Sequence, residues 1–267
     1  MISVVTAAPS IPDPGSAPAS TSWSSPAGDF CVQSSPCGVD IWRARLDLVP
    51  AETEALSGLL SKDEQNRAAR FRYPVHRGRF IASHGILRNI LSRYLGQSPE
   101  SIRYLANAYG KPHLIDSNRG IDLRYNLSHA QDMALYAIAV DREIGIDVEH
   151  PGRSCQTLEI AARFFAPAEA GAIGELPERL RKKAFFACWT RKEAYLKARG
   201  SGLSAPLNQF AVNVHPEEPP ALLYAAWNGK AHMKWTLFDV DPGGGYMAAV
   251  AVEGRVSTVR YFDAAAA

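Results

Sequence analysis

The sequence predicts an α+β fold made of two similar α/β halves, each a small, mostly antiparallel sheet packed on a long helix. Three observations support this prediction. Residues 77–94 and 177–199 have the apolar spacing of long helices, and each helix ends near a glycine, at Gly96 or Gly200. The string Ala-Ala-Arg-Phe, with a proline three residues later, precedes each of them. The C-terminal third is rich in segments that read as strands. We interpret the repetition as a duplicated unit whose copies face one another.

Composition limits the possible functions. The chain has 267 residues and a net charge of +2, which does not favour nucleic acid as the main partner. No apolar run is long enough to span a bilayer, and the N-terminus lacks a secretory pattern. The four cysteines form no CxxC pair, which favours free thiols. We therefore expect a cytoplasmic protein without a membrane partner.

The chain divides into four predicted parts. Residues 1–38 are rich in proline, serine and alanine, so we expect a disordered or loosely attached leader. Residues 39–141 form the N-terminal half and residues 142–263 the C-terminal half. Residues 264–267 form a frayed tail.

In the N-terminal half we expect a strand at 41–48, followed by helices at 52–60, 62–72 and 77–94. Pro74 breaks the second helix. His84 falls on the apolar face of the third, so we interpret it as a core residue. A short segment at 102–105, a turn at 108–112 and a strand at 133–140 follow.

In the C-terminal half we expect a strand at 145–149, helices at 158–165 and 177–199, and four more strands at 210–214, 234–240, 246–252 and 256–262. If the long helices are aligned by their terminal glycines, Asn89 corresponds to Glu193 and Arg93 to Lys197. The first half then lacks a carboxylate at this position. We therefore expect one active cleft, between the halves.

Two short stretches have the chemistry of a metal and phosphate site. In Gly145-Ile146-Asp147-Val148-Glu149 the two carboxylates alternate along a strand and share a face. Glu193 and Lys197 are four residues apart on one helix face. Three carboxylates suit Mg²⁺, and a lysine can neutralise charge on a phosphate. Taken separately, each motif can equally be a solvated surface or a weak surface ion pair.

Read together, these motifs resemble a known family. Gly145-Ile146-Asp147-Val148-Glu149 with Trp189-x-x-Lys192-Glu193-Ala194-x-x-Lys197 closely resembles the signature of 4′-phosphopantetheinyl transferases of the two-halved, monomeric Sfp type. Tyr109-Gly110-Lys111-Pro112 and Asn126-Leu127-Ser128-His129 match the intermediate motifs of that family, in order. The resemblance implies two halves related by pseudo-twofold symmetry. It also implies transfer of the phosphopantetheine arm of coenzyme A to a serine of an apo acyl or peptidyl carrier protein, which releases adenosine 3′,5′-bisphosphate.

The resemblance also implies roles for individual residues. Asp147, Glu149 and Glu193 would hold Mg²⁺, or Mn²⁺ in its place. Glu193 would also be the general base for the serine, directly or through a metal-bound water. Lys197 would stabilise the leaving phosphate, and Lys192 is a weaker candidate for the same work. For Lys192 an exposed helix lysine is an equal alternative.

Other residues would contact coenzyme A. The resemblance places them at the 3′-phosphate (Arg67, Arg70, Arg79), in an adenine and phosphate loop (Tyr109, Lys111) and at the nucleotide (Ser128, His129). The alternative for the arginines is a solvated basic face, and for His129 a turn cap. Because the carriers of this family are acidic, Arg191, Lys197 and Arg199 could steer docking near the loop 200–203.

Two other functions remain open at this point. A Mg²⁺-dependent nuclease also combines Asp, Glu and Lys, but here the lysine lies on a helix far from the strand. A non-catalytic binder of coenzyme A or carrier proteins would not need all three carboxylates. The pathway served by the carrier, whether fatty-acid, polyketide or nonribosomal-peptide synthesis, cannot be read from these motifs.

Overall fold

The structure is a computed structural model that describes residues 22–26, 37–115, 122–152, 156–200 and 205–264. The first set of elements is β1 (Gly38–Arg45), α1 (Pro50–Gly58), α2 (Lys62–Ala69), α3 (Pro74–Leu95), β2 (Tyr104–Ala106), β3 (Pro112–Leu114), β4 (Leu123–Ala130) and β5 (Met133–Val140). The second set is β6 (Ile144–Glu149), α4 (Thr157–Phe164), α5 (Pro167–Glu175), α6 (Glu178–Arg199), β7 (Phe210–Val212), β8 (Leu222–Ala225), α7 (Ala231–Lys234), β9 (Trp235–Val240), β10 (Met247–Glu253) and β11 (Thr258–Asp263).

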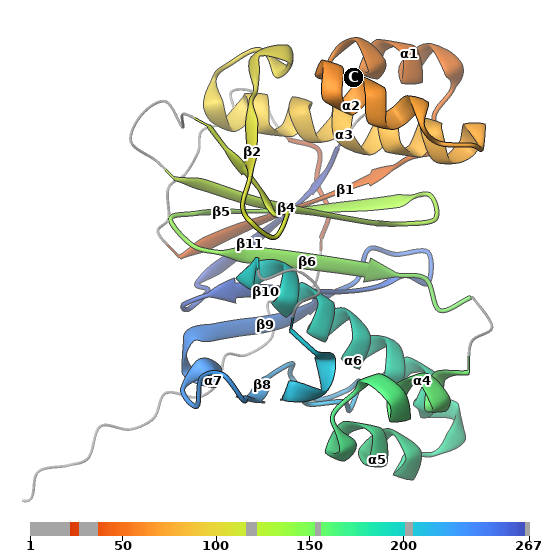
Figure 1. The fold of residues 1–267 in the computed structure, drawn as a ribbon, viewed down its shortest axis with the longest axis vertical. Helices are drawn as coiled ribbons and strands as arrows, with labels where there is room; N and C mark the ends of the chain where they lie inside the picture. Colours follow the sequence, from red (N-terminus) through yellow and green to blue (C-terminus); the bar gives the residue numbers. More distant parts are fainter. Residues whose placement is uncertain (1–21, 27–36, 116–121, 153–155, 201–204, 265–267) are drawn as a thin grey trace, which may run out of the picture.

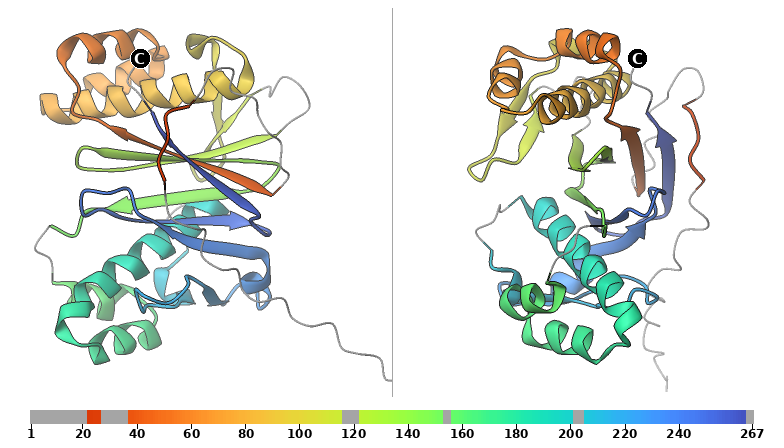
Figure 2. Two further views of the ribbon diagram at one scale, coloured as in Figure 1. Left: turned by 180° about the vertical axis from the view of Figure 1, so that it is seen from behind. Right: turned by 90° about the vertical axis from the view of Figure 1, so that its right-hand side faces the viewer.

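The strands lie between two groups of helices. Figures 1 and 2 show α1, α2 and α3 at one end of the molecule and α4, α5 and α6 at the other. One sheet has the order β11-β1-β5-β4 and the second the order β6-β10-β9. The predicted α+β class is confirmed.

The same order of elements occurs twice. In each copy a strand is followed by two short helices, a 22-residue helix, a two-stranded ribbon and two further strands. The antiparallel orders β1-β5-β4 and β6-β10-β9 are equivalent, and β11 is added in parallel beside β1. This repetition favours duplication and the division at residues 141 and 142. The pseudo-twofold axis stays a prediction.

The Ala-Ala-Arg-Phe string is not evidence for the duplication. Its first copy ends α2 and its second lies in α4, which are not equivalent in the repeated order. The terminal glycines, in contrast, are equivalent. Gly96 (φ 62°) and Gly200 (φ 64°) end α3 and α6 in the left-handed region, which glycine adopts at little cost.

Each long helix is tied to the short helix before it by a buried ion pair. Arg88 Nε donates to Glu64 Oε2 at 2.9 Å, and Lys192 Nζ donates to the Glu169 carboxylate at 2.6 and 2.8 Å. Glu64 and Glu169 each also accept the backbone N–H at the start of their own helix, at 2.8 and 2.9 Å. Because Arg88 and Lys192 both stand eight residues before the terminal glycine, the pairs are equivalent. They support the duplication independently of element order.

Part of the predicted leader is attached to the fold. Ser24 N donates to Tyr261 O at 3.2 Å, and Asp263 N donates to Ser24 O at 2.9 Å. The Trp23 ring packs on Tyr261 and lies beneath the Arg43 guanidinium. This short segment therefore extends the sheet beside β11, where we had expected loose attachment. Ala264, the first residue of the predicted tail, donates to Arg43 O at 2.8 Å.

Two further expectations concern cysteines and membranes. Cys37 and Cys188 are free thiols, while Cys31 and Cys155 lie outside the described residues. Within the described part of the chain, no helix has the length and apolar character needed to cross a membrane.

We predict that Lys192→Met destabilises the protein strongly. Lys192 is fully buried, so the substitution leaves the Glu169 carboxylate buried without its cation. Removing one partner of such a pair costs about 3–5 kcal/mol. The measurement is the free energy of unfolding in urea, with exposed Lys182→Met on the same helix as the control. A loss below about 1 kcal/mol would contradict this role of the pair.

Candidate active site

The candidate site depends on a close approach between α6 and β6. A Cβ atom at Gly145 would lie 2.2 Å from Ala194 O and 2.3 Å from Ala198 N, so only glycine fits at this crossing. The crossing lies between Glu193 and Lys197 on the helix and just before Asp147 on the strand. The predicted meeting of these two stretches is therefore built into the backbone.

Lys197 connects three elements. Its Nζ donates to Asp147 Oδ1 at 2.6 Å, to Ser128 Oγ at 2.8 Å and to Ile146 O at 3.2 Å. Ser128 Oγ also donates to Asp147 Oδ1 at 3.0 Å. The predicted residues from β4, β6 and α6 thus form one polar cluster.

The cluster lies where the two sheets meet. Ile146 N donates to Asn126 Oδ1 at 2.9 Å and Val148 N donates to Ser128 Oγ at 3.4 Å, so side chains of β4 cover the edge of β6. The matched motif 126–129 therefore joins the halves as well as contributing to the site. It lies at the contact between the halves, where the sequence predicts the active cleft.

Two carboxylates of the cluster have raised pKa values. Asp147 is 5% exposed, and burial raises its pKa although the Lys197 ammonium opposes the shift. Burial also raises the pKa of Glu193, and the negative charges of Asp147 and Glu149 raise it further. The three carboxylates therefore act on one another, as expected if they share a cation.

The residues fit a divalent cation. Asp147 Oδ2 is buried and has no hydrogen-bond partner, which is costly unless a cation or donor occupies that side. Carboxylate oxygens are the donors that Mg²⁺ and Mn²⁺ prefer. Over the described residues, however, no three His, Cys, Asp or Glu side chains are already arranged as a metal site. The set Asp147, Glu149 and Glu193 stays a prediction.

A cluster of positive charge lies beside these carboxylates. The pKa of His129 is lowered by burial and then by the charges of Lys197, Arg79 and Arg67. The Arg79 guanidinium binds both Asp47 oxygens, at 2.7 and 2.9 Å, and the Arg67 guanidinium lies 5.3 Å from the centre of the Phe80 ring. The predicted anion-binding residues Arg67 and Arg79 therefore lie near enough to His129 to influence its pKa, although their contacts are with Phe80 and Asp47.

His84 is packed within α3, as its place on the apolar face indicated. Its ring stacks on Phe80 at 3.9 Å, and its Nδ1 lies 3.0 Å from Phe80 O and 3.1 Å from Ser83 Oγ. Burial lowers its pKa to about 4, although the nearby Glu64 charge opposes the shift. These contacts agree with the core role expected from the sequence.

Several predicted contacts lie elsewhere. The Lys111 ammonium donates to Glu143, to Ala198 O and to Ile144 O at 2.5, 2.7 and 3.2 Å, so its three N–H groups join the halves and none is left for a ligand. Tyr109, two residues earlier, is 61% exposed. Arg70 is exposed at the end of α2, and no described contact brings it into the cluster.

The side chains of Lys192 and Arg191 are engaged inside the fold and do not contact the polar cluster of Lys197, Asp147 and Ser128. Lys192 is neither a phosphate ligand nor an exposed lysine, because it is buried against Glu169 and donates to Phe210 O at 2.6 Å. Arg191 is buried against Asp239, at 2.6 Å, and cannot steer a partner. The Arg199 guanidinium lies over the Trp227 ring at 4.1 Å. Residues 201–204 of the predicted docking loop lie outside the described residues.

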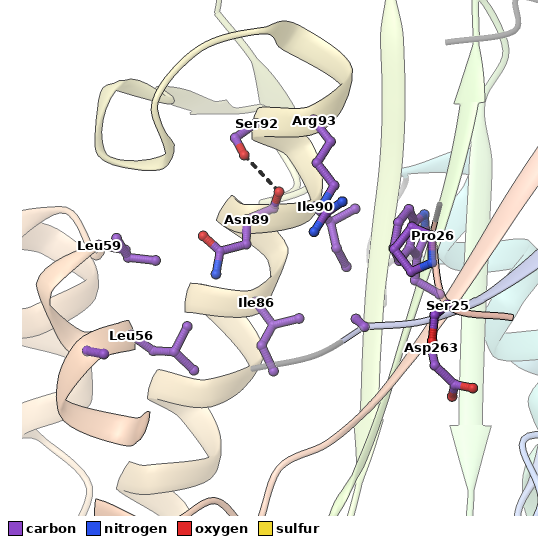
Figure 3. Close-up of a pocket in the computed structure, with 13 residues that line it drawn as sticks. Ser25, Pro26, Leu56, Leu59, Ile86, Asn89, Ile90, Ser92, Arg93 and Asp263 are labelled. Atoms are coloured by element: carbon purple, nitrogen blue, oxygen red, sulfur yellow. Dashed lines mark hydrogen bonds between the residues drawn. The ribbon is translucent and has the colours of Figure 1, made fainter. Parts of the chain in front are cut away.

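The equivalent face of α3 carries no carboxylate. Asn89 and Arg93 replace Glu193 and Lys197, and they line a separate cavity of about 740 Å³ between α3, α1 and the end of β11. Figure 3 shows both side chains beside the apolar Ile86 and Ile90. Among the described residues lining this cavity, Asp263 is the acidic one, and its carboxylate binds Arg43. Of the two long helices, α6 is therefore the one whose face carries the predicted carboxylate and lysine.

We predict that Glu193→Gln stabilises the metal-free protein at neutral pH. Because folding raises the pKa of this carboxyl, its ionised form is less favourable in the folded chain than in the unfolded one. The penalty applies above the folded-state pKa and disappears as pH falls through it. We expect a rise in Tm of about 2 °C at pH 7.5 and none at pH 4. Exposed Glu217→Gln is the control, and an equal or lower Tm at pH 7.5 would refute the assignment.

Comparison with known proteins identifies the family. Residues 143–251 match the family described as the 4′-phosphopantetheinyl transferase superfamily. The chain is 41% identical over 216 residues to the 4′-phosphopantetheinyl transferase HetI of Nostoc sp., covering 81% of this chain and 88% of that protein. It is 34% identical over 165 residues to a putative 4′-phosphopantetheinyl transferase of Synechocystis sp., covering 61% and 67%. It is also 28% identical over 192 residues to Sfp of Bacillus subtilis, covering 72% and 82%. The chain therefore belongs to the 4′-phosphopantetheinyl transferase superfamily.

Proposed function

We propose that this protein transfers the 4′-phosphopantetheine arm of coenzyme A to a serine hydroxyl of an apo carrier protein, with a divalent cation and release of adenosine 3′,5′-bisphosphate. The observation that carries the proposal is the contact of Lys197 with Asp147 at 2.6 Å, next to a Glu193 whose pKa responds to Asp147 and Glu149. Relatives that carry the family name support the same group transfer.

The reaction needs alignment and charge neutralisation. The serine oxygen attacks the β-phosphorus of coenzyme A, and the bond from that phosphorus to the bridging oxygen breaks. Glu193 accepts the serine proton, and its raised pKa brings it closer to the range in which a carboxylate works as a base. Lys197, whose side chain is 30% exposed, can turn from Asp147 to the departing phosphate and stabilise its charge.

Asp147, Glu149 and Glu193 would hold Mg²⁺ or Mn²⁺. When bound, the cation would supply positive charge against the pyrophosphate. Glu193 serves both as a metal ligand and as the proton acceptor in this proposal. Its position on a helix, opposite two strand carboxylates, is compatible with either role.

The positive cluster would bind the nucleotide end of coenzyme A. Arg67 supplies charge and hydrogen-bond donors for the 3′-phosphate, His129 supplies a ring N–H donor, and Arg79 adds charge while it remains bound to Asp47. Exposed Tyr109 remains a candidate for the adenine. Lys111 and Lys192 are left out because their ammonium groups are engaged inside the fold.

We predict that Asp147→Ala and Glu193→Gln each reduce transfer by at least about 100-fold while the fold survives. The measurement is transfer of label from coenzyme A to the serine of an apo carrier protein, followed by mass spectrometry, with circular dichroism as the folding check. EDTA should stop transfer by the unsubstituted enzyme, and Mg²⁺ should restore it.

Full activity in either variant would refute the metal-site assignment. Two further measurements separate the rival functions. Cleavage of DNA in a parallel reaction would indicate a nuclease. Tight binding of coenzyme A without transfer would indicate a non-catalytic binder.

We predict that Arg67→Ala raises the KM for coenzyme A about tenfold and leaves the KM for 3′-dephospho-coenzyme A unchanged, because the lost charge-assisted hydrogen bonds go to the 3′-phosphate. Exposed Lys62→Ala on the same helix is the matched control and should change neither value. An equal rise for both substrates would place Arg67 elsewhere on the nucleotide.

A further inference from the structure

The turn between α2 and α3 is strongly basic. Residues 65–99 contain no aspartate or glutamate, and five arginines lie between residues 67 and 79. Arg67 and Arg79 act on His129 in the positive cluster. The remaining three, Arg70, Arg72 and Arg77, are exposed.

The same turn exposes large apolar side chains. Phe71, Tyr73 and Val75 are 39%, 55% and 49% exposed. The Arg72 guanidinium lies over the Tyr73 ring at 5.5 Å, and Tyr73 also contacts the His76 ring. We call residues 70–77 the corner patch. Exposed aromatic side chains set among cations are typical of a surface that binds a partner.

The charges of the corner patch are not balanced within the fold. Arg79 and Arg88, on the same helix, are paired with Asp47 and Glu64. Across the described residues no carboxylate forms an ion pair with Arg70, Arg72 or Arg77. Such charges raise the local potential and attract an acidic partner.

The corner patch lies on the same side of the molecule as the candidate site. Arg67 and Arg79 flank it in sequence, and both lie close enough to His129 to lower its pKa together with Lys197. In Figures 1 and 2 the α2–α3 turn lies on the same side of the molecule as the β4–β5 turn and the end of β6. A macromolecule whose serine reaches the cluster would therefore be in reach of this patch.

We propose that the corner patch is the docking surface for the apo carrier protein, and that it recognises an acidic helix with apolar residues on the same face. This inference rests on the proposed function. Arginines at the rim steer the encounter, while Tyr73 and Val75 give an apolar anchor. It replaces the docking role expected of Arg191, which is buried.

The test uses the double variant Arg72→Glu/Arg77→Glu, and the matched control is Lys182→Glu/Lys183→Glu at the far end of α6. Substrates are coenzyme A, Mg²⁺ and an apo acyl carrier protein accepted by the unsubstituted enzyme. We expect the KM for the carrier to rise about tenfold with kcat unchanged, and kcat/KM to become less sensitive to salt. Calorimetry should give an unchanged Kd for coenzyme A, and the control should resemble the unsubstituted protein.

Tyr73→Ser tests the apolar part separately. It should raise the KM for the carrier about fivefold at low and at high salt, because burial of an aromatic side chain is insensitive to screening. Circular dichroism should show all variants folded, since every substituted side chain is exposed.

Three outcomes would overturn the docking proposal. An unchanged KM for the carrier in both variants would do so directly. A matching loss of coenzyme A affinity would make the patch part of the nucleotide site. A third outcome would be that the unsubstituted protein sediments with phosphatidylserine vesicles and the double variant does not, while the carrier kinetics stay unchanged. The corner patch would then be a membrane-contact surface. If the unsubstituted enzyme transfers nothing to any carrier, both the proposed function and the docking proposal are refuted. If the enzyme transfers and the variants transfer equally well, only the docking proposal is refuted.

Discussion

The close approach of α6 to β6 at Gly145 is the constraint on which the candidate site depends. A side chain at this position would overlap the helix backbone at Ala194 and Ala198. With glycine the helix lies directly on the strand, and Lys197 reaches Asp147. The relative position of Asp147 and Lys197 is therefore set by backbone contact, which is stiffer than contact through side chains.

Two equivalent ion pairs, Arg88 with Glu64 and Lys192 with Glu169, orient the long helices but are not part of the candidate site. Glu169 binds Lys192 and also the start of α5, so one buried carboxylate fixes two helices. Lys192 and Glu193 are neighbours in sequence but about 100° apart on the helix, so they face different surroundings. Lys192 is buried against Glu169 and orients α6, whereas the pKa of Glu193 responds to the charges of Asp147 and Glu149.

Local patterns predicted which side chains share a face, and the family motifs indicated that the strand and the helix meet. Strand alternation places Asp147 and Glu149 on one face, and helical spacing places Glu193 above Lys197. The errors concern lysines whose partners lie outside the matched motifs. Lys111 binds the carbonyl of Ala198, 87 residues away, and Lys192 binds Glu169, 23 residues away. Neither periodicity nor a family motif distinguishes a buried lysine from an exposed one when its partner belongs to no motif. The pairing of β11 with β1, 220 residues apart, was hidden for the same reason.

The repeated order of elements confines the costly groups to one half of the chain. Asp147 keeps one buried oxygen without a partner, and such a group costs about 1–3 kcal/mol. In the other half the equivalent helix face carries Asn89 and Arg93, so no set of carboxylates has to be buried there. Both halves retain the buried pair that orients the long helix. The ion pair that orients the long helix can therefore stabilise both halves. The unfavourable burial of like charges is confined to the half in which a cation and a phosphate would offset it.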